Sequence, residues 1–159
     1  MCVKSVNFGA DYRALMLKFT DGRSFGLDVY NGLLDWSVSG DGASWNLVSH
    51  IGRAEDLEDN TWHYIVGTYN GTLGYAYSDG DLIESDGNAG SINVSTSRIH
   101  IGGQPAIEFV NSLIDEPRVS LGVRTAAWIK ATYNSLWDSL LTYGSEETSG
   151  NAIFFGTNL

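Results

Sequence analysis

The sequence predicts an all-β domain, an antiparallel sandwich of the jelly-roll kind, with one short surface helix near the C-terminus. Three observations lead to this prediction. Short runs of alternating apolar and polar residues follow one another closely, turn-forming Asn-Gly and Asp-Gly pairs separate them, and a single segment has helical spacing instead. Strands of this length at this spacing are typical of β-sandwiches and jelly rolls.

The clearest element is a hairpin in the stretch FGLDVYNGLLDW, with Asn31-Gly32 at its turn. Both residues tolerate the positive φ of a two-residue turn, and the turn fixes the pairing register. Asp28 then lies opposite Asp35. Because opposed carboxylates repel, the face that carries them is expected to meet water, a ligand or a cation. The other face is expected in the core and carries Leu27, Val29, Leu34 and Trp36.

The other strands follow from the same alternation, each ending near a turn signal. The predicted strands, in order, are 13–19, 24–30, 33–39, 45–50, 62–69, 74–78, 81–85, 91–94, 97–102, 107–111 and 113–120. The exception is RTAAWIKATYNSLWDSL, residues 124–140, which is rich in helix formers. Thr125 is its expected N-cap. One face of this helix carries Trp128, Ile129, Thr132 and Tyr133 and is expected to pack its aromatic residues on the sandwich, with Trp137 as a further anchor.

Composition excludes several classes of function. The 159 residues carry a formal charge of −10, so the surface lacks the positive charge that binds nucleic acid or anionic membranes. The single cysteine, Cys2, excludes an internal disulfide. The sequence contains neither an apolar run long enough to insert into a membrane nor a recognisable secretory signal.

Several motifs occur in the order of a known family: TWHYIVGTYNGT (61–72), YSDGDLIES (77–85), IHIGG (99–103) and NSLIDEPRVS (111–120), followed by the helical tail. Together they resemble a laminin G-like jelly roll of the concanavalin A-like lectin/glucanase superfamily, in the version found in bacterial and archaeal surface and exported proteins. The resemblance implies an extracellular or cell-surface location and an accessory role in a larger protein.

The N-terminus departs from this family, whose members usually have one or two strands before a segment like AWVK. Here MCVK takes that place, with Cys2 where the family usually has Trp. We therefore expect residues 1–147 to form a laminin G-like domain that lacks its first strand or strands, and 148–159 to form a C-terminal tail. An open sheet edge would allow homo-oligomers, with the apolar residues 151–156 able to fill the gap in cis or by exchange.

Enzymatic activity is not expected, although the superfamily includes glycoside hydrolases and polysaccharide lyases. Glycosidases need two carboxylates about 5–9.5 Å apart across the sugar. Asp115 and Glu116 are adjacent on a strand, so they point to opposite faces. Asp28 and Asp35 could be close enough, but the sequence shows no device that would raise the pKa of either. A hydrolase or lyase is therefore the third-ranked alternative.

A calcium ion is the one cofactor that the resemblance suggests. In the family the acidic residue of the IDE motif often contributes to a calcium site, and this residue is Asp115 here. Calcium takes six to eight oxygen ligands, and the usual partners come from the N-terminal strands that this chain lacks. The alternative is that Asp115 or Glu116 caps a turn or pairs with Arg118.

The expected function is non-catalytic binding of a polysaccharide or other glycan. Aromatic rings cover the apolar face of a sugar, while nearby polar groups hold its hydroxyls, and such a site needs few groups. The alternatives are a structural, adhesive or self-assembling module without a sugar site, in which these residues are ordinary strand or solvated residues, and the hydrolase or lyase. The predicted ligand-binding residues are Tyr75, Tyr77 and Asp79, joined by Asp28, Tyr30 and Asp35 if both hairpins share a sheet, and Trp45 near a loop end.

Overall fold

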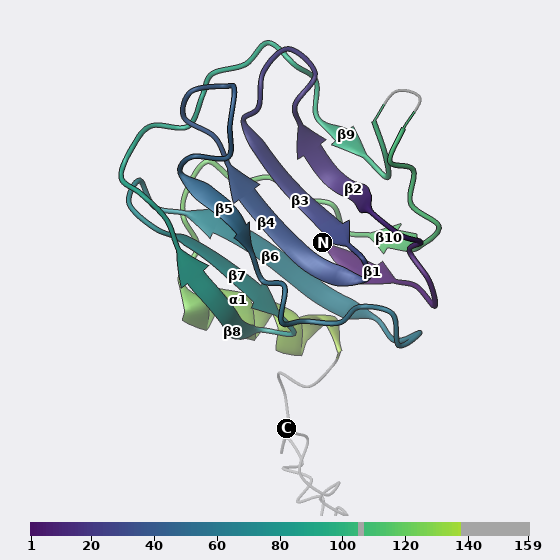
Figure 1. Cartoon of the computed structure of the whole chain (residues 1–159). Coiled ribbons are helices and arrows are strands. Elements are labelled where there is room, and N and C mark those ends of the chain that lie inside the picture. The colour runs from purple at the N-terminus through teal and green to yellow at the C-terminus, as the bar shows by residue number, and fades with distance from the viewer. Residues whose placement is uncertain (105–106, 138–159) are drawn as a thin grey trace, which may run out of the picture.

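Two five-stranded antiparallel sheets pack face to face, and one helix lies on the outer face of one of them (Figure 1). The computed structural model describes residues 1–104 and 107–137. We call the sheets front and back, as they lie in Figure 1. The front sheet has the order β5-β4-β3-β2-β9. Its strands are β2 (Tyr12–Lys18), β3 (Phe25–Tyr30), β4 (Leu33–Val38), β5 (Val48–Ile51) and β9 (His100–Ile101).

The back sheet has the order β10-β1-β6-β7-β8. Its strands are β1 (Cys2–Lys4), β6 (His63–Tyr69), β7 (Gly74–Ser78), β8 (Asp81–Asp86) and β10 (Leu113–Asp115). The short strand β1 lies inside this sheet, between β10 and β6, and Val3 is fully buried. The two sheets of the sandwich confirm the predicted fold class.

The β3–β4 hairpin has the predicted register. Asn31 and Gly32 take φ values of 50° and 81°, and Asp28 pairs with Asp35. The opposite face of the hairpin enters the core between the sheets, together with residues of both sheets: Leu15, Leu27, Val29, Leu34, Trp36, Val38, Ile65 and Ala76. Gly67 on β6 has no side chain because the Trp36 ring occupies that space, 2.3 Å from where a Cβ would lie. The local turn chemistry therefore positions the core of the whole sandwich.

The helix α1 (Ala126–Leu136) begins at the predicted N-cap, because the Thr125 hydroxyl accepts a hydrogen bond from the Trp128 N–H. It packs on the back sheet (Figure 1) and forms a second, smaller core there. Of the predicted packing face, Ile129 is fully buried and Tyr133 packs against this core, whereas Trp128 is 40% exposed. Trp137, the further expected anchor, is 38% exposed. The helix is therefore anchored by the aliphatic residue of the predicted face rather than by the two tryptophans.

Several predicted strands are shorter than expected or absent, among them 45–50, which overlaps β5 only from Val48 onward. Residues 97–102 and 113–120 contribute only β9 and β10, and residues 91–94 and 107–111 form no strand. In residues 91–94, Asn93 forms hydrogen bonds with Arg23, Ser24 and Ser39 instead of joining a strand ladder. Asn93 donates its backbone N–H to Ser39 and its side-chain amide to the Arg23 carbonyl, while the Ser24 hydroxyl donates to the Asn93 carbonyl. Such polar side chains compete with a regular ladder. The predicted tail, 148–159, lies outside the described residues.

Within the described residues, no helix is both long and apolar enough to cross a membrane. The described edges of the back sheet are β10 and β8, and those of the front sheet are β5 and β9. The outer faces of the two sheets differ, because α1 packs on the back sheet, while loops alone rim the front one (Figure 1).

Candidate functional site

The predicted ligand-binding residues lie on both sides of the sandwich and do not form one site. Asp28 and Tyr30 on β3, and Asp35 on β4, belong to the front sheet. Tyr75 and Tyr77 belong to β7 in the back sheet. Asp79 follows them in the β7–β8 turn, and Trp45 lies in the β4–β5 connection.

The two back-sheet tyrosines pack beneath the helix. Tyr77 is only 6% exposed and shares the smaller core with Tyr64 and Ile129, while Tyr75 packs against its rim. Burial raises the pKa of the Tyr77 hydroxyl above its usual range. The sequence had suggested an exposed platform for a sugar, and the structure differs. Alternation along a strand predicts which side chains share a face of the sheet, but it does not predict whether another element packs on that face.

Asp35 is the central residue of a polar network on the outer face of the front sheet. It is 1% exposed, yet Arg53 donates from Nε to its Oδ2 at 2.5 Å. His50 Nδ1 lies 3.1 Å from Oδ1, and the Ser37 hydroxyl donates to the same oxygen at 3.2 Å. The Arg53 guanidinium also donates to the Tyr12 hydroxyl at 2.7 Å. A buried carboxylate with these partners is compensated, as a buried charge must be.

Asp28 has the opposite environment. It is 7% exposed, and its Oδ1 has no hydrogen-bond partner in the described chain. Burial, followed by the nearby charges of Asp35 and Glu108, raises the pKa of Asp28 well above its usual range. A protonated Asp28 removes the repulsion between the opposed pair. The expectation that no device raises either pKa was therefore wrong for Asp28. Of the environments expected for this face, Asp35 meets a cation, the guanidinium of Arg53.

Gly26 makes room for this carboxyl. A Cβ at that position would lie 2.6 Å from the Asp28 Oδ2 and 2.9 Å from Leu17 Cδ1. Glycine inside a strand commonly marks such a close approach. The sequence FGLD therefore places a small residue two positions before the buried acid on the same face.

A pocket of about 260 Å³ opens above Asp28. Its walls come from β2, the β2–β3 and β4–β5 connections, β5 and the β9–β10 connection. The lining residues are Tyr12, Leu17, Phe19, Arg23, Asp28, Trp45, His50, Gln104 and Glu108. Open pockets lined by aromatic rings with a few polar groups are the usual form of small-ligand sites.

Aromatic rings stand on two sides of this pocket. Phe19 and Trp45 stack with ring centroids 6.2 Å apart, and the Arg23 guanidinium lies over both rings. On the other side Tyr12 packs against Tyr30, with centroids 4.6 Å apart. Of the predicted ligand residues, the structure thus brings Asp28 and Trp45 together at the pocket. Tyr30 packs against Tyr12 of the pocket wall, and Asp35 lies opposite Asp28 in the hairpin.

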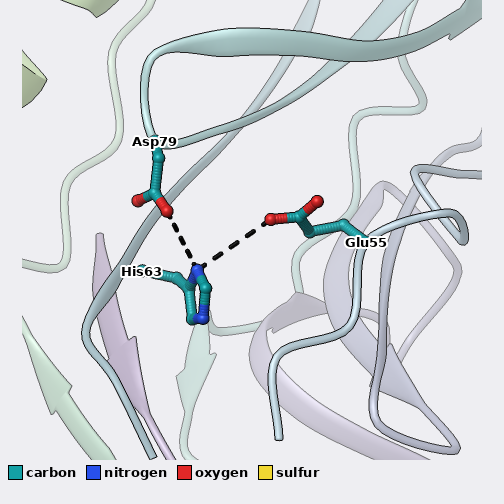
Figure 2. Close-up of side chains that lie close together, drawn as sticks. All are labelled: Glu55, His63 and Asp79. Atoms are coloured by element: carbon teal, nitrogen blue, oxygen red, sulfur yellow. Dashed lines mark hydrogen bonds and ion pairs between the residues drawn. The ribbon is translucent and has the colours of Figure 1, made fainter. Parts of the chain in front are cut away.

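A second polar cluster joins the back sheet to the β5–β6 connection. Figure 2 shows His63 between Asp79 and Glu55, with Nδ1 3.0 Å from an Asp79 oxygen and 3.9 Å from a Glu55 oxygen. The other ring nitrogen lies 3.0 Å from Asp59. Hydrogen bonds that the His63 ring donates to Asp79 first, and then to Asp59, raise the pKa of His63 to about 9.

These three residues are grouped closely enough to be considered as metal ligands. At neutral pH, however, an imidazolium carries protons on both nitrogens, and a metal binds the neutral ring. Asp79 also accepts the Tyr64 N–H at 2.8 Å. The cluster therefore fits a set of ion pairs around the buried His63, which hold the β7–β8 turn against β6, better than it fits a metal centre.

Asp115 lies on the edge strand β10 and accepts the Glu116 N–H at 2.7 Å. Arg118 pairs with Glu116, as the alternative reading anticipated for one of the two acids. No group of three or more His, Cys, Asp or Glu ligands in the described chain includes Asp115. Calcium binding by Asp115 stays a prediction, which a calcium titration of the melting temperature, with Asp115→Asn in parallel, would test.

Comparison with protein families decides the relationship. A model of the concanavalin A-like lectin/glucanases superfamily matches residues 3–130. The chain belongs to this superfamily. No curated protein matches it significantly.

Solved structures similar to this concanavalin A-like domain include toxin binding domains. The binding domain of Paraclostridial Mosquitocidal Protein 1 aligns with a TM-score of 0.62 and 14% identity, over 86% of this chain and 36% of that one. Botulinum neurotoxin type C, reported to enter cells through interaction with two ganglioside molecules, aligns with a TM-score of 0.58 and 13% identity, over 85% and 34%. The chain thus spans about a third of these proteins, and the likeness shows a shared fold.

Sequence reasoning missed several residues of the pocket. Phe19, Arg23, His50, Gln104 and Glu108 line it, and the sequence predicted a ligand role for none of them. Gln104 and Glu108 come from a connection far along the chain and carry no local signal. The one usable signal was the β2–β3 pairing, because Tyr12 lies opposite Tyr30 and so continues the outer face of the hairpin.

Proposed function

We propose that this concanavalin A-like domain binds carbohydrate in the pocket on the outer face of its front sheet, without catalysing a reaction. One observation carries the proposal. Aromatic rings stand on two sides of a polar floor that holds a buried carboxyl with an unpartnered oxygen. A sugar offers apolar C–H faces for the rings and hydroxyls for the floor, so its two kinds of surface match the two kinds of wall.

The family and its structural neighbours support this proposal. The superfamily takes its name from lectins and glucanases, both of which engage carbohydrate. One neighbour, botulinum neurotoxin type C, interacts with gangliosides, which are sugar-bearing lipids. An extracellular or cell-surface location is part of the same proposal, because such ligands are displayed there.

The absence of catalysis is proposed from the state of the two carboxyls. A glycosidase requires a proton donor and a free carboxylate on either side of the bond. Burial favours the proton on Asp28, but both oxygens of Asp35 are engaged, one by Arg53 and one by His50 and Ser37. Asp35 is also 1% exposed, which leaves no approach for a sugar carbon.

Replacing Trp45 tests the proposed site. We expect Trp45→Ala to weaken glycan binding by roughly tenfold or more, since losing one stacking ring typically costs a few kcal/mol at a binding site. Trp128→Ala is the matched control, because that tryptophan is also partly exposed but lies on α1, away from the front sheet. Isothermal titration against glycans selected on an array gives the affinities. Equal loss in both variants, or in neither, contradicts the proposed site.

A second candidate function is self-association with another copy. It is favoured by the segment that follows β10, in which Val119, Leu121 and Val123 alternate and are 56%, 106% and 54% exposed. Leu113 on the edge strand β10 is also 60% exposed. Apolar side chains beside an unpaired edge favour strand-to-strand pairing between chains. Sedimentation velocity over a range of concentrations tests this, and a Leu121→Glu variant should remain monomeric if the segment is the contact.

A further inference from the structure

The guanidinium of Arg23, which lines the pocket, is held by aromatic rings, and the described residues supply no ion-pair partner for it. The Arg23 guanidinium lies 5.0 Å from the Phe19 ring centroid and 5.5 Å from that of Trp45. Its Nε is buried and makes no hydrogen bond with any residue of the described chain, and no carboxylate there pairs with it. The two rings hold the side chain in place by cation–π contact, so its donors are positioned before any ligand arrives.

The other polar group without a partner in the same pocket is the Asp28 carboxyl. Its Oδ1 is buried and unbonded, and the residue is more than nine-tenths buried. Unpartnered buried polar atoms are costly and rare, and each one in a native fold calls for an explanation. Two such groups lining one pocket in a protein point to a shared ligand.

We propose that the ligand is a sugar that carries a carboxylate, held by Arg23 and Asp28. This proposal rests on the proposed function, because it names the class of glycan that the same pocket takes. The ligand carboxylate would accept hydrogen bonds from the Arg23 guanidinium, while the protonated Asp28 carboxyl would donate to another oxygen of the same sugar. The sugar ring would lie against Trp45.

A carboxylate fits the donors of the pocket better than a neutral hydroxyl does. A guanidinium presents parallel N–H donors that match the two oxygens of a carboxylate, and such charge-assisted bonds are roughly twice as strong as neutral ones. A protonated carboxyl is a donor from which another oxygen of the same sugar can accept. A neutral sugar would leave the Arg23 charge uncompensated.

After burial, the charges of Asp35 and Glu108 raise the pKa of Asp28, so an anion would be held at Arg23, the arginine among the lining residues, rather than at Asp28. From β4, Asp35 is neutralised by Arg53 and faces His50 of β5. From the β9–β10 connection, Glu108 accepts the Gln104 amide, and burial raises the pKa of Glu108 as well. β2 contributes Tyr12 to the pocket, and the cation that faces it from the β2–β3 connection is Arg23.

The proton on Asp28 also gives the binding a pH dependence. Its folded pKa lies above the usual range, so the donor form exists below that pKa and is lost as pH rises through it. Once ionised, Asp28 repels the ligand carboxylate and no longer donates. Affinity for an acidic sugar should therefore fall with rising pH, and Asp28→Asn, which keeps an N–H donor and cannot ionise, should remove this fall.

The test compares acidic glycans with their neutral parents, using the full 159-residue chain. Suitable probes are sialyllactose against lactose, and galacturonate oligosaccharides against their methyl esters, with a sulfated galactan as a second anion. We expect the carboxylated member of at least one pair to bind about tenfold or more tightly, the gain expected of a charge-assisted pair. Isothermal titration supplies the affinities, and thermal melts confirm that each variant is folded.

Two arginine variants test whether Arg23 causes the preference for the acidic glycan. Arg23→Gln should abolish the preference for the acidic member while leaving weak binding of the neutral one. Arg124→Gln is the matched control, because Arg124 also stacks on a tryptophan, 4.8 Å from the Trp128 ring, but at the helix. An equal loss in both arginine variants overturns the assignment.

The outcomes separate this inference from the proposed function. Equal binding of acidic and neutral members overturns the carboxylate inference and leaves carbohydrate binding standing. Binding of the sulfated galactan alone overturns the choice of carboxylate. Binding of no glycan, acidic or neutral, overturns both proposals.

Discussion

At the scale of single residues, the buried acids of the β3–β4 hairpin have unequal roles. Asp35 is compensated by a cation and by hydroxyl and imidazole contacts, whereas Asp28 has an unsatisfied oxygen in the pocket floor. A fold tolerates such an unsatisfied group when a ligand or a proton completes it. The unsatisfied oxygen of Asp28 therefore supports the site that we propose.

The cost of burying Asp28 can be measured as a pH dependence of stability. In the unfolded chain Asp28 ionises near pH 4, while its folded pKa is raised. The folded state then binds the extra proton, so its contribution to stability falls as pH rises from about 4 up to the folded pKa. We expect Asp28→Asn to remove this fall and to stabilise the domain at neutral pH. Urea unfolding of both proteins between pH 4 and 8 checks it, and parallel curves at all pH values would contradict the raised pKa.

Asp35 provides the opposite test. Replacing it by Asn removes the charged partner of Arg53, which is 32% exposed at its side chain, and leaves the network incomplete. Breaking a buried ion pair usually costs about 3–5 kcal/mol, and the partial exposure of Arg53 favours the lower end of that range. We expect Asp35→Asn to lose about 3 kcal/mol in the same unfolding assay. A loss below about 1 kcal/mol would mean that the pair behaves as a surface one.

At the scale of elements, α1 stabilises the sandwich through one side chain. Ile129 is fully buried against Tyr64 and Tyr77, and truncating such a residue typically costs about 2–5 kcal/mol. We expect Ile129→Ala to lower the melting temperature by roughly 5–15 °C for a domain of this size. Trp128→Ala, on the exposed side of the same helix, should lower it far less. A similar loss in both variants would place the helix contact elsewhere.

Elements were predictable where their signals are local. The turn at Asn31-Gly32 fixes the β3–β4 register within a dozen residues, and Thr125 marks the start of α1. The segment 91–94 was predicted as a strand because its alternation is real, but Asn93 and its serine neighbours satisfy the backbone by other bonds. The short strand β1 has only three residues, too few to show a period.

At the scale of the whole molecule, the pocket was only partly predictable. Asp28 and Trp45 were singled out from the sequence, but Gln104 and Glu108 reach the same pocket from about 60 residues or more further along the chain. Tyr75 and Tyr77 show that contacts between distant elements were also not predictable on the back sheet. Their strand and face were assigned correctly, yet only the packing of α1 decides that this face is covered.

The proposed sugar pocket opens on the front face, whereas α1 lies on the back sheet. If that pocket binds a glycan as we propose, a polymer that runs across the front face makes one such contact with each copy. Several copies set side by side, with their helices turned away, would present their pockets toward the same polymer. The helix on the back sheet thereby suits the domain to avidity, in which the effective concentration among neighbouring copies converts weak single contacts into firm adhesion.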